Sequence, residues 1–249
     1  MIDRIRSLLP VFLSLLILVM VSFSIALNSF EKGQFTCNRY ILNTYLYIIL
    51  TFNIIAVQCL SLEYNNVNYV LNLWQHLAVL LILIGVIIIL RFVSAKNVIT
   101  KHLAWLLLII LLGFVFYPLY NFTEDKNIIL SAALTTILIT VILSAVAFLK
   151  PESISFSLGP ILLFMLIAVI IMEVSLLIIY RNDYSSITNI LRGVSYLVIF
   201  IFVGFILYDT KMLQIRAKQC KNNADYINES LHIFLDMFNI FVRLIGLGR

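Results

Sequence analysis

The sequence predicts an all-α membrane protein, and three observations lead to this class. Of its 249 residues, 63% are hydrophobic and only 12% are charged, whereas a soluble domain is about 45–50% apolar and a quarter charged. The mean hydropathy is +1.08. Apolar runs of about 20 residues, the length that spans a bilayer, recur along the chain. A cytosolic enzyme, a nucleic-acid-binding domain and a disordered regulator are excluded, because so many apolar side chains cannot be buried in a domain of this size.

Eight apolar runs are the predicted helices. Backbone polar groups in lipid must be satisfied within each segment, and no alternating ten-residue pattern indicates a barrel, so each run is expected to be a helix. The connections are too short for a domain outside the membrane, and the lipid bilayer is the expected partner. The runs cover residues 8–27, 41–62, 73–93, 103–120, 128–149, 159–180, 191–212 and 229–247.

Basic residues are concentrated in the connections after the third, fifth and seventh runs. The opposite connections, 63–72, 121–127 and 181–190, contain only Lys126 and Arg181. Because Lys and Arg mark cytoplasmic loops, the net charge of +5 is assigned to cytosolic connections beside anionic lipid and not to a nucleic-acid partner. The basic residues of these connections are Arg91, Lys96, Lys101, Lys150, Lys211, Arg216, Lys218 and Lys221.

The first run, 8–27, fits this alternation less well. Arg4 and Arg6 precede it and Lys32 and Arg39 follow it, so both flanks have the character of cytosolic sequence. A signal-anchor, a re-entrant or tilted helix and a cleaved signal peptide are the alternatives. The run is longer than the hydrophobic core of a usual signal peptide, which favours a retained segment whose topology stays open.

The sequence contains no recognisable catalytic or metal-binding motif. Cys37, Cys59 and Cys220 are an odd number of cysteines without a CxxC pair or a neighbouring pair of histidines, so we expect three isolated thiols and no zinc site. Nucleophile-elbow, zinc-protease, P-loop and dinucleotide-binding signatures are absent from the sequence as well. We therefore expect a protein that is not an enzyme and that holds no cofactor.

Two carboxylates in the last two runs are the strongest functional candidates, because ionisable groups at membrane depth are costly. Asp209 lies near the predicted cytosolic end of the seventh run, and Asp236 lies about two turns into the eighth from the same side. Consecutive helices are frequent neighbours, so these side chains can face each other. Two close carboxylates share a proton, titrate as a unit and attract Ca²⁺ when ionised. Two separately solvated carboxylates near helix ends are the alternative, and spacing does not choose between the two.

Asp236 also belongs to a polar stripe on the eighth run. His232, Asp236, Asn239 and Arg243 follow spacings of four, three and four residues, so they share one face of a helix. We expect this face to point into the bundle or a water path, and a helix lying in the membrane interface is the alternative. Glu173, in the middle of the sixth run, is a secondary intramembrane carboxylate for which a structural role and a place on an ion path are both open.

Three motifs near the carboxyl end resemble the transmembrane Bax inhibitor motif family, which includes the lifeguard and Bax-inhibitor proteins. They are Tyr208–Asp209–Thr210, Asp225–Tyr226–Ile227 and the stretch from Leu235 to Phe241, and they agree with the family in order, spacing and helix placement. Similarity at 44–51 and 148–159 extends the resemblance to residues 39–249. The resemblance implies a seven-helix bundle of the Bax-inhibitor type over 39–249, with the last helix in the centre, and an additional hydrophobic segment at 1–38.

The same resemblance implies a function. Members of the family are associated with passive Ca²⁺ leak and with suppression of cell death, and in bacterial members a proton-sharing aspartate pair is latched by an arginine. Carried to this sequence, the pair is Asp209 and Asp236 and the latch is Arg91. The resemblance thus implies a pH-sensitive leak channel for Ca²⁺ that responds to H⁺. Its membrane would be the endoplasmic reticulum or Golgi in a eukaryotic or viral setting, and the plasma membrane in a bacterium.

A second class of function stays open, namely a non-conducting protein that suppresses apoptosis by binding other membrane proteins. Such binding would use transmembrane faces or the basic segment 211–224, since no exposed domain is expected.

The sequence also departs from the family pattern at two places. The run 8–27 is additional, and the basic cluster after the second family helix is reduced to Arg91 and Lys96.

Overall fold

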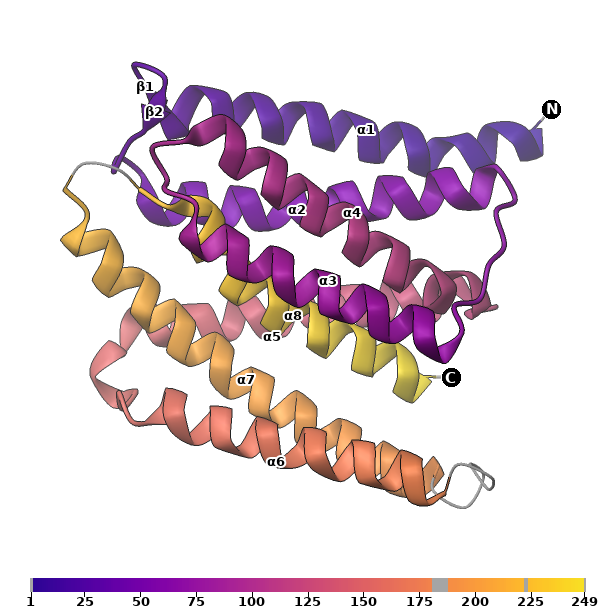
Figure 1. Ribbon diagram of the computed structural model, residues 1–249. Coiled ribbons are helices and arrows are strands. Elements are labelled where there is room, and N and C mark those ends of the chain that lie inside the picture. The colour runs from indigo at the N-terminus through magenta and orange to yellow at the C-terminus, as the bar shows by residue number, and fades with distance from the viewer. Residues whose placement is uncertain (1, 181–187, 222–223, 249) are drawn as a thin grey trace. The chain divides into compact units, whose positions relative to one another are not determined.

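Helices make up almost all of this computed structural model, which describes residues 2–180, 188–221 and 224–248 (Figure 1). Seven of the described helices are long and apolar enough to cross a membrane, and the apolar part of α3, Ala78–Phe92, is shorter. The predicted all-α membrane architecture is therefore confirmed. The helices are α1 (Ile2–Ser29), α2 (Tyr40–Tyr64), α3 (Leu73–Phe92), α4 (Val98–Phe122), α5 (Lys126–Leu149), the short η1 (Pro151–Ser153), α6 (Leu158–Ile179), α7 (Thr188–Gln219) and α8 (Tyr226–Gly248).

Apart from α1, which begins at Ile2 and not near residue 8, the helix boundaries follow the apolar runs closely with two exceptions. α4 begins at Val98 and not near 103, which brings Lys101 into its first turn. α7 continues to Gln219 and does not end near 212, so most of the basic connection predicted after it is helical. Both extensions mix polar and charged residues with apolar ones. A search for apolar runs ends where the apolar residues end, and therefore misses them.

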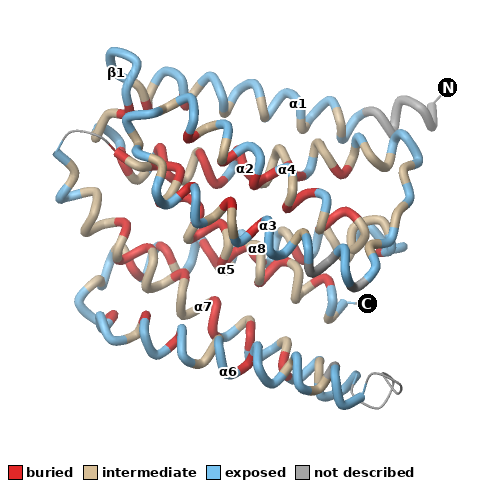
Figure 2. The backbone as a smooth tube through the Cα atoms, in the orientation of Figure 1, coloured by how far each residue is buried: buried red, intermediate tan, exposed pale blue. Residues whose placement is uncertain are grey.

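The chain forms two compact units. The first contains Met1–Glu124 and Ala217–Leu231, and the second contains Asp125–Arg216 and His232–Arg249. Within the first unit, α1 packs against α2, α2 against α4, and α4 against α3. Figure 2 shows buried stretches on α2 and α4, whereas α1 is exposed along most of its length. The exposed side chains of α1 are mostly apolar, which suits a surface in contact with lipid.

A small β-hairpin, which the sequence analysis did not predict, connects α1 to α2. Its strands, β1 (Phe30–Glu31) and β2 (Gln34–Phe35), pair in antiparallel register. Lys32 and Gly33 form the turn with φ values of 51° and 79°, because a two-residue hairpin of the favoured twist needs positive φ at both central positions. Phe35 is 2% exposed, so the hairpin is anchored in the first unit.

The expectation of three isolated thiols is wrong, because Cys37 and Cys220 form a disulfide with their Cα atoms 5.8 Å apart. Cys37 follows the hairpin and Cys220 follows α7, and both belong to the first unit. The two cysteines are separated by 183 residues, and motif rules that depend on short spacings cannot connect them. Cys59 is a buried thiol of α2.

The disulfide constrains the membrane topology. Its two cysteines must lie on the same side of a bilayer, so the chain between them crosses the bilayer an even number of times. Six described α-helices, α2 to α7, lie between Cys37 and Cys220, besides the short η1. If the other five cross, α3 must cross as well, although its apolar stretch is the shortest. This agrees with the alternation predicted from the basic connections.

Tyr69 compensates for a break in the hydrogen bonding of α4. Pro118 lies inside this helix and has no N–H for the carbonyl of Phe114 one turn earlier. The hydroxyl of Tyr69, in the connection between α2 and α3, donates to that carbonyl at 2.6 Å. Burial, with smaller contributions from Cys59 and Tyr117, raises the pKa of Tyr69 to about 12. Tyr69 therefore remains a hydrogen-bond donor throughout the physiological pH range.

Candidate functional site

The Tyr208–Asp209–Thr210 motif lies in α7. The residues on either side of Asp209, Tyr208 and Thr210, contact other helices of the second unit. A Cβ atom at Gly159, at the start of α6, would lie 2.6 Å from the ring of Tyr208, so any larger residue would displace this ring. Thr210 is fully buried, and its hydroxyl lies 3.4 Å from the hydroxyl of Ser144 in α5. The backbone that carries Asp209 is thus positioned by α5 and by α6.

Two further contacts continue this anchoring along α7. The Nζ atom of Lys211 donates to the carbonyl of Ile154 at 2.5 Å and lies 3.9 Å from the ring centre of Phe156. The amide of Gln214 donates to the carbonyl of Ala147 at 2.8 Å. Lys211 lies inside α7 and is 7% exposed, so its assignment to the connection after the seventh run is wrong. The extension of α7 instead buries this ammonium group against backbone oxygen and an aromatic face.

Asp236 is the buried carboxylate of the candidate site. It lies in the part of α8 that belongs to the second unit, and it is 6% exposed. Its Oδ2 atom has no hydrogen-bond partner in the part of the chain that the structure describes. Asp209 is half-buried and lies close to Asp236. One oxygen of a buried carboxylate thus remains for a proton, a water molecule or a cation, while proton sharing by the two residues stays a prediction.

The other residues of the polar stripe have different surroundings. His232 is half-buried, and it is the first residue of α8 that belongs to the second unit. The side-chain amide of Asn239 donates to the carbonyl of Leu235 in its own helix at 2.8 Å. The burial of Asp236 favours a stripe that faces the interior over a helix in the membrane interface. The roles of His232 and Asn239 on an ion path stay predictions.

Glu173 is not an isolated carboxylate, because Arg243 at the far end of the stripe pairs with it. The two guanidinium nitrogens of Arg243 donate to the two carboxylate oxygens of Glu173 at 2.6 and 2.8 Å. The hydroxyl of Ser195 lies 3.5 Å from the same guanidinium. The sequence indicated each member of this pair but not the pairing, because α6 and α8 are separated by a long stretch of chain. A bidentate pair of this kind satisfies both charges where water is scarce.

A second ion pair, in the first unit, was not foreseen. Lys101 was assigned to a cytosolic connection, but it lies in α4 and is fully buried. Its Nζ atom contacts Asp225 at 2.5 Å and the carbonyl of Val93 at 2.9 Å. Asp225 in turn accepts a hydrogen bond from the backbone N–H of Asn228 at 3.2 Å. Lys101 therefore joins the end of α3 to the residue that caps the start of α8.

Tyr226 adds an uncharged contact next to this pair. It is fully buried, its hydroxyl donates to the carbonyl of Thr36, and the amide of Asn43 donates to its oxygen at 3.2 Å. The Asp225–Tyr226–Ile227 motif thus has a structural role at the start of α8. The motif itself was visible in the sequence, but its partners, in α2 and α4 and in the connections that precede these helices, were not.

Arg91 lies in the last turn of α3 and is exposed. It belongs to the first unit, whereas Asp209 and Asp236 belong to the second, so its role as a latch stays a prediction. Within the described residues no group of three or more His, Cys, Asp or Glu side chains is placed to hold a metal ion. The two aspartates are therefore a site of two carboxylates, to which water would have to supply most ligands of a Ca²⁺ ion.

A comparison with protein families gives the identity of the chain. The model of the family described as inhibitor of apoptosis-promoting Bax1 matches residues 37–247. No curated protein gives a significant match. The matched segment starts after α1 and includes α2 to α7 and all but the end of α8, with both aspartates. This multi-pass membrane protein therefore belongs to the Bax inhibitor family.

Proposed function

We propose that the protein is a pH-sensitive leak channel for Ca²⁺ in an intracellular membrane, gated by Asp209 and Asp236. The observation that carries the proposal is the burial of Asp236 beside Asp209, with Oδ2 of Asp236 unpartnered among the described residues. A buried carboxylate in a membrane-spanning helix is costly and is usually retained for ion or proton movement. The family match supports the proposal.

Proton sharing gives the pair a gating mechanism. A hydrogen bond between two carboxyl groups requires that one of them carries a proton. Loss of that proton leaves two like charges close together in a medium of low dielectric constant, and their repulsion favours movement of α8 away from α7. The same two charges then attract a divalent cation. Arg91, acting as a latch, would offset the repulsion and hold the closed arrangement.

Replacement of either aspartate by asparagine is expected to change Ca²⁺ flux and to remove most of its pH dependence, because an amide cannot lose the shared proton. Flux would be measured in liposomes that contain Asp209→Asn or Asp236→Asn, from mildly acidic to mildly alkaline pH. Glu152→Gln is the matched control, since Glu152 is an exposed acid of η1. Unaltered flux and unaltered pH response in both aspartate variants would contradict the proposal.

Removal of the latch is expected to move the pH midpoint of Ca²⁺ flux upward, because Arg91 stabilises the ionised pair by its positive charge. The variants are Arg91→Ala, Asp209→Asn and the double variant. The shift should vanish when Asp209 is already asparagine, since both changes then act on one network and are not additive. An unchanged midpoint in Arg91→Ala would remove Arg91 from the mechanism and leave the aspartate pair in place.

A non-conducting function is the second candidate, and the description of the matched family as an inhibitor of an apoptosis-promoting protein favours it. In this alternative the protein binds apoptosis-related membrane proteins through its transmembrane faces. A cell-death assay with the aspartate variants separates the two candidates. Variants that lose flux but still protect cells would favour binding, and joint loss of flux and protection would favour conduction.

A further inference from the structure

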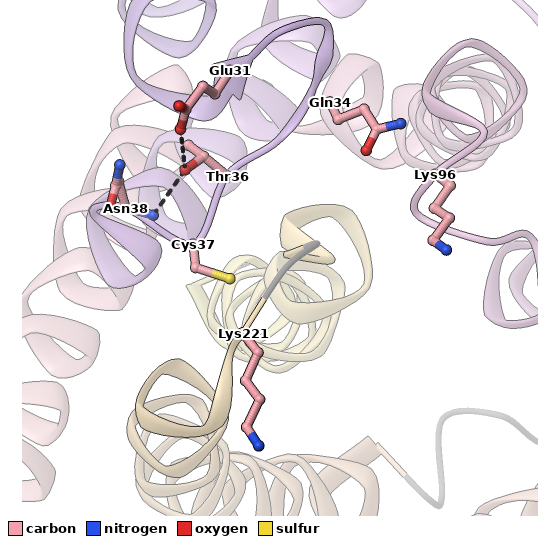
Figure 3. A pocket seen from close by; sticks show the side chains of 7 residues that line it. All are labelled: Glu31, Gln34, Thr36, Cys37, Asn38, Lys96 and Lys221. Carbon is pink, nitrogen blue, oxygen red and sulfur yellow. Dashed lines mark hydrogen bonds between the residues drawn. The ribbon is translucent and has the colours of Figure 1, made fainter.

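A polar cavity lies beside the Cys37–Cys220 disulfide in the first unit. Its volume is about 570 Å³, inside the range of about 300–1,000 Å³ that is usual for sites of small molecules. Figure 3 shows the side chains that line it, which come from the hairpin, the segment before α2 and the connections after α3 and α7. Cys37 is half-buried and forms part of the wall. A molecule in the cavity can therefore reach one sulfur of the disulfide.

The charges around the cavity define the chemistry of a suitable ligand. Lys96 and Lys221 are exposed, and neither ammonium group has an acidic partner in the ranges of the chain that the structure describes. Glu31 supplies one negative charge and accepts a hydrogen bond from Thr36 at 3.5 Å. Two cations and one anion fit a molecule that carries two carboxylates and one ammonium group. The side-chain amide of Gln34 adds a neutral polar contact.

The expected compartment gives the disulfide a chemical role. The basic residues predict that the connection with Cys220 faces the cytosol, where persistent disulfides are rare and those that occur are mostly redox-sensing or catalytic. Such a disulfide opens and closes by exchange with the thiols around it. Cys37 is the sulfur that the cavity exposes. Attack by a thiol in the cavity at Cys37 therefore makes Cys220 the leaving thiolate.

We propose that this cavity binds a small peptide thiol with two carboxylates and one ammonium group, the glutathione class, and directs its thiolate to Cys37. This proposal does not depend on the leak function. Lys96 and Lys221 hold the two carboxylates, and Glu31 holds the ammonium group. The cavity thus makes the Cys37–Cys220 disulfide respond selectively to one class of cellular thiol.

The exchange balances with two molecules of the peptide thiol. The thiolate of the first attacks Sγ of Cys37, an S–S bond forms between them, the Cys37–Cys220 bond breaks, and Cys220 leaves as a thiolate that takes a proton from water. The second thiolate attacks the sulfur of the bound peptide and releases the Cys37 thiolate. Two peptide thiols are oxidised to one peptide disulfide, while the protein disulfide is reduced by two electrons. Oxidation of the protein follows the same steps in reverse.

Opening of the disulfide should loosen the chain locally without unfolding the first unit. The Lys101–Asp225 ion pair and the hydrogen bond from Tyr226 to Thr36 still connect the same segments. Variants of the cavity can therefore be studied in a folded protein.

The test compares three thiols on the purified full chain in lipid nanodiscs, each at the same thiolate concentration and each rate expressed relative to that thiol's rate with a small model disulfide. Reduced glutathione, neutral 2-mercaptoethanol and cationic cysteamine are added, and mass spectrometry follows the mixed disulfide and locates it by peptide mapping. Glutathione is expected to react at Cys37 about fivefold faster than 2-mercaptoethanol, the scale of two solvent-exposed ion pairs, and cysteamine is expected to be slowest. If the chain is isolated with Cys37 and Cys220 reduced, the reverse reaction is measured. The symmetrical disulfide of each thiol is then added, and the rates at which the three disulfides oxidise the protein are compared.

Charge variants test the site itself. Lys96→Gln and Lys221→Gln should remove most of the preference for glutathione, while Lys218→Gln, an exposed lysine of α7 outside the cavity, should keep it. Glu31→Gln should slow glutathione but speed 3-mercaptopropionate, which has a carboxylate and no ammonium group. Equal rates for all three thiols, equal preferences in all lysine variants, or a mixed disulfide at Cys220 would each overturn the proposal.

Discussion

Replacement of Arg243 by methionine is expected to lower the free energy of unfolding by about 3 kcal/mol, the scale for breaking a buried ion pair from one side. The change leaves the carboxylate of Glu173 without the two hydrogen bonds of 2.6 and 2.8 Å that now satisfy it. Both side chains are largely shielded, with 29% and 18% exposed, and they lie in helices suited to cross a membrane. Unfolding of the reconstituted protein by denaturant measures the loss.

The double variant Arg243→Met with Glu173→Met gives the sharper result. It should recover most of the stability, because two apolar side chains in place of a buried pair cost little. Arg192→Met, at an exposed arginine of α7, is the matched control and should stay within about 0.5 kcal/mol. Additive losses in the double variant would mean that the two residues do not stabilise the protein through each other.

Replacement of Lys101 by methionine is the second change with a large expected effect, again about 3 kcal/mol. Lys101 is fully buried, and its loss leaves the carboxylate of Asp225 and the carbonyl of Val93 without their charged donor. The same denaturant experiment measures this loss. Asp225→Asn on the Lys101→Met background should restore part of the stability, since asparagine removes the unpaired charge and can still cap α8.

Lys96 provides the control for this experiment. It is a lysine of the neighbouring connection and is exposed, so Lys96→Met should change stability by no more than about 0.5 kcal/mol. A Lys101→Met variant as stable as Lys96→Met would show that the ion pair with Asp225 does not hold the end of α3 to the start of α8.

The sequence predicts the helices of this protein well because their cause is local. A run of about 20 apolar residues is sufficient for a helix across lipid, and the runs at 41–62 and 73–93 lie within two residues of α2 and α3. Prediction becomes weaker where the apolar composition ends. The first turn of α4 contains Lys101, and hydropathy alone assigned it to a connection, although tertiary contacts make it helical and buried.

The contacts of the candidate residues were less predictable than their positions. The spacing of the stripe singled out Asp236 and Arg243, but only the fold could show that Arg243 meets Glu173 and that Asp236 is buried. The Cys37–Cys220 disulfide was missed because its cause is entirely non-local. Each cysteine lies in a short connection with no local signal, and the distance of 183 residues exceeds the reach of any spacing rule.

The separation of 183 residues between Cys37 and Cys220 also determines when the disulfide can form during biosynthesis. At roughly 5–20 residues per second, the ribosome needs on the order of 10–40 s to extend the chain from Cys37 to Cys220. During this interval the sulfur of Cys37 has no partner and is open to reaction with other cysteines. Once Cys220 has been made, the bond can close only if the chain between the two cysteines crosses the bilayer an even number of times, because one helix that fails to cross would leave the two sulfurs on opposite faces. Closure of this bond in a newly made chain thus reports that both cysteines have reached the same side of the membrane.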